Sequence, residues 1–362
     1  MTKNDEALLD ATTALVPPLL TSLEALAFAG RHLHPPHLPR LAASLAGFDE
    51  PLRAGRARFD AQPWPDDLQF FHSQLVTASD AALRALDGVT KSATDPDGVM
   101  RAYRAMRHST QAVEALYPLT FMLPPVSRFF LEHDRRSDDA LVRRIADADA
   151  LREDVGIRSV HNARGERGGF SVYVPEYYDA ATRWPLIVAL HGGSGHGADF
   201  LWTWLREART RGAIVISPTS RGGTWSLMEP AIDGDALRSL IALVAGRWSI
   251  DHERVLLTGM SDGGTFSLLT GLLDRAPFTH LAPISGSFHP MLLEGASDIR
   301  DLPIYLVHGA LDWMFPIDMA RTAAAALSAA GAAVTFREID DLSHTYPRDE
   351  NPRILDWLLA AE

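Results

Sequence analysis

The chain contains no cysteine and only two lysines, Lys3 and Lys91, among its 362 residues. The lack of cysteine excludes disulfide bonds, thiolate metal ligands and every mechanism with a thiol nucleophile. The scarcity of lysine excludes a Gly-Lys-Ser/Thr phosphate loop and argues against a Schiff-base lysine. Serine is the main nucleophile that remains to be looked for.

Positive charge is also in short supply, because 46 acidic residues against 34 basic ones give a net charge of −12. Such a surface repels phosphate backbones, so we expect no nucleic-acid partner. No apolar run reaches the roughly 18 residues of a membrane span, since residues 14–28 are interrupted by Pro17, Pro18 and Glu24. The first residues are acidic, where a secretory signal would be basic. We therefore expect a cytoplasmic protein without a membrane span.

The spacing of apolar residues divides the chain into two parts. Up to about residue 155 they recur at three- and four-residue steps, the pattern of amphipathic helices. One such stripe comprises Leu68, Phe71, Leu75, Ala78, Ala82 and Leu86. A length of 362 residues is typical of two domains. We expect a helical N-terminal domain over residues 1–155 and a second domain over residues 156–362.

From Gly156 onward, short β-branched runs alternate with helical stretches. We expect strands at residues 170–174, 186–190, 213–217, 255–257, 304–307 and 334–339. This alternation is typical of an α/β fold with a mostly parallel sheet and helices on both faces. Ligands of such open sheets bind beyond the carboxyl ends of the strands, so candidate site residues are expected there.

Ser261 lies in the motif Gly-Met-Ser-Asp-Gly at residues 259–263, between the strand at 255–257 and a helical stretch. In the G-x-S-x-G turn the glycines permit a tight, strained backbone that exposes the serine hydroxyl. The helix N-terminus behind the serine favours developing negative charge. A glycine-rich turn with a capping serine is the alternative interpretation. The position between strand and helix favours a nucleophile.

A serine nucleophile needs a base, and the base needs an acid that orients it. In this arrangement the chain order is serine, acid, histidine. Asp312 follows the strand at 304–307, and His344 follows the strand at 334–339. Both therefore lie at the same edge of the sheet as Ser261, and we predict them as the acid and the base.

Four other residues compete for these two roles: Asp301, Asp318, His308 and His289. Asp301 precedes its strand, and Asp318 is typical of a residue that caps a helix. His308 is expected inside the strand end, where a hydrogen-bonded core histidine is the simpler interpretation.

The strand at 186–190 ends in a glycine-rich loop, residues 191–195. The oxyanion of acyl transfer needs two backbone N–H donors. One is expected from Asp262 and the other from Gly193, with Gly192 or Ser194 as alternatives. A flexible turn or a phosphate cradle is the other interpretation of this loop. We expect the side chain of His191 to support the loop.

Together these motifs resemble the α/β-hydrolase superfamily over residues 156–362. The pattern is most similar to phospholipase/carboxylesterase and polyhydroxybutyrate-depolymerase-like esterases. It comprises Tyr-Val-Pro-Glu-Tyr-Tyr at 173–178, Pro-Leu-Ile-Val-Ala-Leu-His-Gly-Gly at 185–193, residues 259–264, His308 to Asp312, and His344. The resemblance implies an α/β-hydrolase fold and serine hydrolysis of a small-molecule carboxylic ester, without metal or organic cofactor. Asp262 departs from it, since many relatives carry Met, Gln or Ala there, and its charge disfavours acidic acyl groups.

We therefore expect a serine carboxylesterase that acts on short- to medium-chain esters through a Ser-His-Asp triad and an acyl-enzyme. A thioesterase, peptidase or acyltransferase with the same residues is the alternative. An alternative of another class is a helical binding or scaffold module with an attached esterase. Residues 1–155 do not match this fold. They are a candidate lid, binding module or dimerisation element, so a homo-oligomer through them is one expectation.

Three residues are candidates for a substrate pocket, namely Trp225, His191 and Met260. An indole offers apolar surface with a polar handle, although ordinary packing explains Trp225 equally well. The N-terminal part also has three histidines among prolines: His32, His34 and His37. Three histidines can bind zinc, but proline-rich spacing fixes no ligand face, and we expect no metal.

Overall fold

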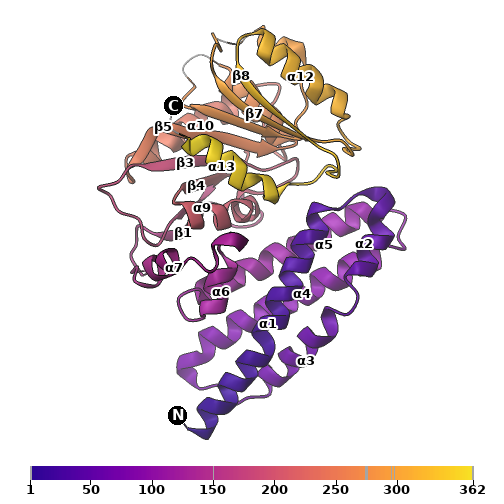
Figure 1. Cartoon of the computed structure of the whole chain (residues 1–362), viewed down its shortest axis with the longest axis vertical. Helices are drawn as coiled ribbons and strands as arrows, with labels where there is room; N and C mark the ends of the chain where they lie inside the picture. Colours follow the sequence, from indigo (N-terminus) through magenta and orange to yellow (C-terminus); the bar gives the residue numbers. More distant parts are fainter. Residues whose placement is uncertain (1, 150, 274–275, 295, 297, 361–362) are drawn as a thin grey trace. The chain divides into compact units, whose positions relative to one another are not determined.

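The computed structural model describes residues 2–149, 151–273, 276–294, 296 and 298–360. The chain divides into two compact units, Met1–Asp138 and Asp139–Glu362. The first unit is helical, and the second is built around a sheet (Figure 1). The helical N-terminal part and the α/β architecture of the C-terminal part are thereby confirmed.

The helical unit packs its long helices through small and branched apolar side chains. One face of the first helix buries Leu15, Leu19 and Leu23 at four-residue spacing. The fourth and fifth helices pack closely, since their buried faces carry many alanines. The unit comprises α1 (Lys3–Arg31), α2 (Leu38–Ser44), α3 (Asp49–Asp60), α4 (Gln69–Ser92), α5 (Gly98–Leu116) and α6 (Pro124–Phe129).

Helix α1 is longer than its apolar run suggested. It continues through Pro17 and Pro18, because each proline removes only one backbone hydrogen bond and the buried leucines continue on both sides. By length and hydropathy α1 therefore meets the requirement for a membrane-spanning helix, although part of it is buried in the structure. The length of the apolar run alone underestimated this segment.

The sheet unit has eight strands in the order β1-β2-β4-β3-β5-β6-β7-β8. Strands β1, β2 and β4 pair antiparallel, and β4, β3 and β5 to β8 pair parallel. All six predicted strands are present, whereas β1 and β6 were not predicted. The strands are β1 (Gly156–Val160), β2 (Phe170–Val174), β3 (Trp184–Leu190), β4 (Ile214–Pro218), β5 (Ile250–Met260), β6 (His280–Ile284), β7 (Pro303–Gly309) and β8 (Ala333–Ile339).

Helices cover both faces of this sheet, because successive strand residues point to opposite sides. Leu186, Val188 and Leu190 of β3 share one core with buried residues of α10, α11 and α12. Helices α9 and α13 pack against each other, α9 beside β4 and α13 beside β5 (Figure 1). The helices of this unit are α7 (Asp139–Ala146), α8 (Gly197–Phe200), α9 (Leu205–Arg211), α10 (Ala231–Ala245), α11 (Asp262–Gly271), α12 (Ile317–Ala329) and α13 (Asn351–Leu359).

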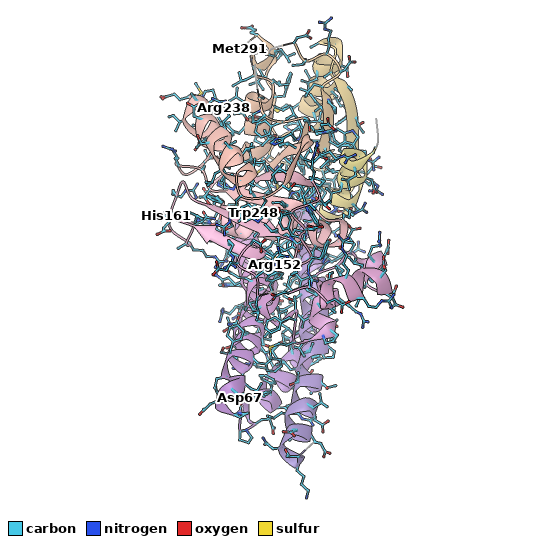
Figure 2. The ribbon with its side chains drawn as sticks, turned by 90° about the vertical axis from the view of Figure 1, so that its left-hand side faces the viewer. Asp67, Arg152, His161, Arg238, Trp248 and Met291 are labelled. Carbon is cyan, nitrogen blue, oxygen red and sulfur yellow. The ribbon has the colours of Figure 1, made fainter. Side chains whose placement is uncertain are left out.

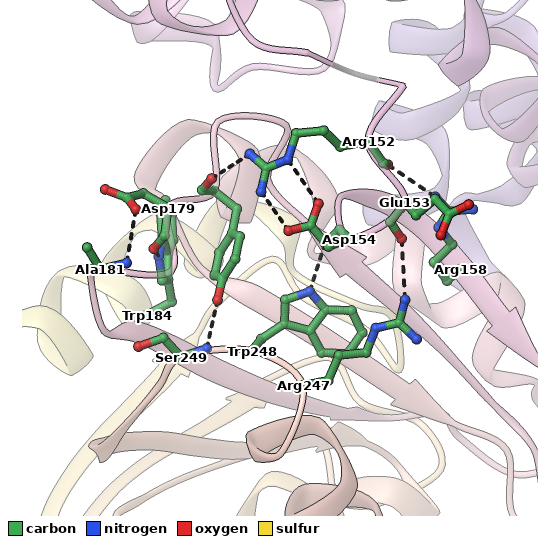
Figure 3. Close-up of polar contacts among 11 residues, drawn as sticks. Arg152, Glu153, Asp154, Arg158, Asp179, Ala181, Trp184, Arg247, Trp248 and Ser249 are labelled. Atoms are coloured by element: carbon green, nitrogen blue, oxygen red, sulfur yellow. Dashed lines mark hydrogen bonds and ion pairs between the residues drawn. The ribbon is translucent and has the colours of Figure 1, made fainter.

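The segment before β1 is fixed to the sheet unit by Arg152 and Trp248, which Figure 2 labels. Arg152 bonds the Asp154 carboxylate at 2.6 Å and donates to the carbonyl of Tyr178, and the Trp248 indole donates to the Asp154 carbonyl at 2.7 Å (Figure 3). In α7, the Arg144 guanidinium lies 4.2 Å from the Tyr177 ring centroid. These contacts explain why the compact units divide before α7, earlier than the change of periodicity at residue 156.

Candidate active site

Ser261 lies between the last residue of β5 and the first residue of α11, with φ 57° and ψ −120°. This backbone conformation is strained for a residue with a side chain. The turn is tight because a Cβ on Gly263 would stand 2.5 Å from the carbonyl oxygen of Leu190, and one on Gly259 would stand 2.6 Å from Gly263. Only glycine fits at these two positions, and the serine between them is held at the carboxyl end of β5.

The three side chains predicted as nucleophile, base and acid form one hydrogen-bonded chain. The Nε2 atom of His344 lies 3.0 Å from the Oγ atom of Ser261. Its Nδ1 atom lies 2.8 Å from Oδ2 of Asp312. Asp312 follows β7, and His344 follows β8. Parallel strands thus bring residues 83 and 32 positions apart to one edge of the sheet.

The environment of Asp312 keeps its carboxylate ionised. Burial would raise the pKa of this carboxyl, but the hydrogen bond from His344 and the backbone N–H groups of Phe315 and Met314 outweigh burial and hold the pKa below its ordinary value. The two N–H groups donate to Oδ1 at 2.8 and 2.9 Å. Oδ2 thereby accepts the hydrogen bond from His344, which favours one orientation of the imidazole ring.

Two backbone N–H groups on the loops around Ser261 make no hydrogen bond within the described residues. Gly193 and Asp262 donate these groups to no atom of the described residues. The N–H of Ser194 donates to the Gly223 carbonyl at 2.9 Å and is no longer available as an oxyanion donor. Gly192 lies beside the nucleophile, since a Cβ there would stand 3.5 Å from the Ser261 Cβ. Within the described residues, the two N–H groups expected from the sequence as oxyanion donors therefore have no competing acceptor.

His191, which is 1% exposed, supports the glycine-rich loop through hydrogen bonds. Its Nε2 accepts from the backbone N–H of Ser220 at 3.1 Å, so the proton sits on Nδ1, which donates to the Gly192 carbonyl at 2.7 Å. Burial lowers the pKa of His191 to about 4 and keeps the ring neutral. The Trp225 indole donates to the His191 carbonyl at 2.7 Å, and Arg167 donates to the Gly195 carbonyl at the same distance.

Comparison with known proteins also supports an ester hydrolase. Residues 232–360 match the sequence model of the family described as Phospholipase/Carboxylesterase. The C-terminal part of the chain is a carboxylic ester hydrolase of the α/β-hydrolase type. This esterase part includes the Ser261, Asp312 and His344 positions, while the N-terminal helices lie outside the match.

The esterase part is also similar to solved structures. A thermostable esterase is 21% identical with a TM-score of 0.46, and the match covers 57% of this chain and 62% of that one. Esterase PE8 is 21% identical with a TM-score of 0.44, covering 53% of this chain and 99% of that one. The fluorophosphonate-binding serine hydrolase FphF of Staphylococcus aureus is 16% identical with a TM-score of 0.46, covering 57% and 98%. A search of curated proteins finds no match.

The four rival residues of the esterase part lie outside the Ser261–His344 chain. Asp301 and Asp318 are exposed, and Asp318 pairs with Arg321 at 2.8 Å. His289 is exposed and accepts the Met291 N–H at 3.2 Å. Unlike the other three, His308 lies beside Asp312. Its Nε2 is 2.8 Å from the Phe315 carbonyl oxygen and 3.5 Å from Asp312 Oδ2.

The candidate pocket residues are placed differently from one another. Trp225 is buried, stacks on Phe266 with ring centroids 5.3 Å apart, and lines a pocket of about 490 Å³ that includes none of Ser261, His344 and Asp312. Met260 is half-buried at the end of β5.

In the helical unit, the rings of His34 and His37 contact each other edge-on at 4.9 Å. Within the described residues, no three His, Asp or Glu side chains gather as metal ligands.

Two contacts at this site were not found from the sequence. Arg167 reaches the Gly195 carbonyl and the loop at Ser220 and Gly222. Thr224 donates to the carboxylate of Asp262 at 2.5 Å. Neither residue belongs to a motif, and each contact joins segments 28 to 55 positions apart, so no local pattern could indicate them.

Proposed function

We propose that the esterase part hydrolyses carboxylic esters with short- to medium-chain acyl groups, through a covalent acyl-enzyme on Ser261. The observation that carries the proposal is the hydrogen-bonded chain of Ser261, His344 and Asp312, with links of 3.0 and 2.8 Å. A serine hydroxyl is a weak nucleophile until a neighbouring base accepts its proton, and this chain supplies such a base. The family match of residues 232–360 supports the same class of reaction.

In the first step, the Ser261 oxygen attacks the ester carbonyl carbon while His344 accepts the hydroxyl proton. The tetrahedral oxyanion accepts hydrogen bonds from the N–H groups of Gly193 and Asp262. Collapse expels the alcohol, which takes its proton from His344 and leaves the acyl group on Ser261. Asp312 stabilises the imidazolium and stays ionised throughout.

In the second step, water attacks the acyl-enzyme while His344 accepts a proton from it. Collapse breaks the bond to Ser261, and His344 returns the proton to the serine oxygen. The net reaction converts an ester and water into a carboxylic acid and an alcohol. The same two donors stabilise the second oxyanion, so no metal or organic cofactor is required by these steps.

The test is Ser261→Ala, assayed with p-nitrophenyl butyrate. We expect kcat/KM to fall by at least 10⁴-fold, because the nucleophile is lost and only binding and the oxyanion donors remain. Ser239→Ala on the exposed side of α10 is the matched control and should hydrolyse the ester at the wild-type rate. An organophosphate should label Ser261 in the wild type, as seen by mass spectrometry. Undiminished hydrolysis by Ser261→Ala would refute the assignment.

The acyl preference and the acceptor need their own measurement. A series of p-nitrophenyl esters from acetate to palmitate should show the highest kcat/KM at or below eight acyl carbons. A parallel series of thioesters and peptides tests the thioesterase and peptidase alternatives, and added alcohols test acyl transfer. A clear preference for one of these substrates over every ester would replace the carboxylesterase proposal.

Two further proposals concern the whole chain. We place the protein in the cytoplasm, and cell fractionation tests this placement because α1 also has the length of a membrane-spanning helix. We also propose that the helical unit mediates self-association, which light scattering of the full chain can measure. A monomer at micromolar concentration, or recovery in the membrane fraction, would contradict the respective proposal.

A further inference from the structure

The carboxylate of Asp262 lies beside the expected oxyanion donors. Its Oδ2 atom accepts the Thr224 hydroxyl at 2.5 Å. The same oxygen lies 2.7 Å from the position that a Cβ of residue 193 would take. The side chain of Asp262 therefore lies against Gly193, one of the two expected oxyanion donors.

Among the residues that the structure describes, no positive side chain pairs with this carboxylate. Within the described residues, no Lys, Arg or His nitrogen lies within 4 Å of Asp262. In the described part of the chain, its only side-chain partner is the uncharged hydroxyl of Thr224. This hydroxyl uses one of several acceptor positions of a carboxylate. The other acidic residues buried near this edge are paired: Asp312 with His344, and Asp233 with two backbone N–H groups.

An unpaired negative charge at this place opposes the reaction that the site is built for. The tetrahedral intermediate carries a negative oxygen next to Gly193 and the Asp262 N–H, and two like charges in a partly dry site repel each other. A positive group on the substrate removes this penalty, since it pairs with the carboxylate while the oxyanion forms. The benefit grows as charge develops on the oxyanion, so it acts on kcat/KM for the cationic substrate.

We infer that Asp262 is a specificity-determining residue that binds a cationic group of the substrate, so that the preferred esters carry a protonated amine or a quaternary ammonium close to the scissile carbonyl. This inference rests on the proposed ester hydrolysis at Ser261. The cation can be on the acyl group or on the alcohol of the ester, and in either place it would form the same ion pair with Asp262. Isosteric substrate pairs distinguish them.

The experiment compares kcat/KM for cationic esters with that for neutral esters of the same shape. In the acyl arm, L-valine benzyl ester is compared with benzyl (S)-2,3-dimethylbutanoate, in which a methyl group replaces the ammonium group. In the alcohol arm, butyrylcholine is compared with 3,3-dimethylbutyl butyrate. We expect the wild type to prefer the cationic member at least tenfold in one arm at pH 7. The preference in the acyl arm should disappear above roughly pH 8, where an α-amino group loses its proton.

Variants separate charge from structure. Asp262→Asn should bring the cationic-to-neutral ratio close to 1, whatever it does to the absolute rates. Asp262→Glu and Thr224→Val both keep the carboxylate, and both should retain a preference for the cationic ester. A merely structural role of the Asp262–Thr224 bond would instead make Thr224→Val and Asp262→Asn behave alike. In the wild type, raising NaCl from 10 to 500 mM should reduce the preference several-fold, because salt screens the pair; this measurement needs no variant.

The outcomes that overturn the inference differ from those that overturn the function. Hydrolysis of both esters at equal kcat/KM in both arms, or a preference that survives in Asp262→Asn, refutes the role of Asp262 and leaves ester hydrolysis intact. Failure of the wild type to hydrolyse p-nitrophenyl butyrate as well as the four esters, or undiminished hydrolysis by Ser261→Ala, refutes the proposed function itself. Hydrolysis of p-nitrophenyl butyrate but of none of the four esters refutes only the role of Asp262.

Discussion

Acidification should destabilise the sheet unit through His191. This ring is buried, donates to the Gly192 carbonyl and accepts from the Ser220 N–H. A proton added to Nε2 would destroy the second hydrogen bond and place a charge in the core. Burial therefore lowers the pKa of His191 to about 4, whereas an unfolded histidine titrates near 6.5.

The sign and size of the effect follow from these two pKa values. Between pH 6.5 and 4 the unfolded chain binds the proton and the folded chain does not, so stability falls as the pH falls. Each pH unit in this window is worth about 1.4 kcal/mol. The His191 contribution is complete above pH 7, has lost about 2 kcal/mol at pH 5, and has lost about 3 kcal/mol below pH 4.

Urea unfolding at pH 7.5 and pH 5.0, followed by tryptophan fluorescence, measures this loss. Seven of the eight tryptophans lie in the sheet unit, the exception being Trp64. The free energy of unfolding should fall by about 2 kcal/mol more in the wild type than in His191→Asn, which cannot titrate. The exposed His289→Asn variant should keep the wild-type loss. Equal losses in the wild type and His191→Asn would refute the reasoning.

Two further substitutions test the loop and the core. Gly193→Ala should lower kcat by roughly 10²- to 10³-fold, because its Cβ would stand 2.7 Å from the Asp262 carboxylate and displace the oxyanion donor. Gly223→Ala, whose Cβ meets open space, should not lower kcat, and equal effects would contradict the argument. Arg209→Met should cost about 3–5 kcal/mol of stability, because it removes the guanidinium that lies 3.0 Å from the buried Glu176 carboxylate. The double variant Glu176→Gln/Arg209→Met should recover at least half of that loss in urea unfolding, and no recovery would rule out the buried Glu176 charge as the cause.

Local sequence predicted those strands whose own side chains favour an extended, buried conformation. Strand β3 is a continuous apolar run with both faces buried. By contrast, β6 contains Pro283, which lacks an N–H and counts against a strand between two neighbours. Strand β1 is short, half-exposed and at the sheet edge, so its pairing with β2 decides its conformation.

The candidate site divides in the same way. The position of Ser261 follows from its flanking glycines, and the order of Asp312 and His344 follows from strand ends that meet at one edge of the sheet. Their hydrogen-bond lengths, the tautomer of His191 and the boundary before α7 depend on contacts between distant segments. The sequence could not supply these.

By itself, the sequence determined the chemistry available to this protein. It has no thiol, it has a serine in a glycine turn, and it has an acid and a histidine after successive strands. Only the tertiary structure decided where charge remains unpaired. Asp262 was recognisable as an unusual neighbour of the serine. That it has no positive partner among the residues the structure describes depends on which side chains the fold brings within 4 Å. Charge–charge interaction depends on distance in space, and distance along the chain does not predict it.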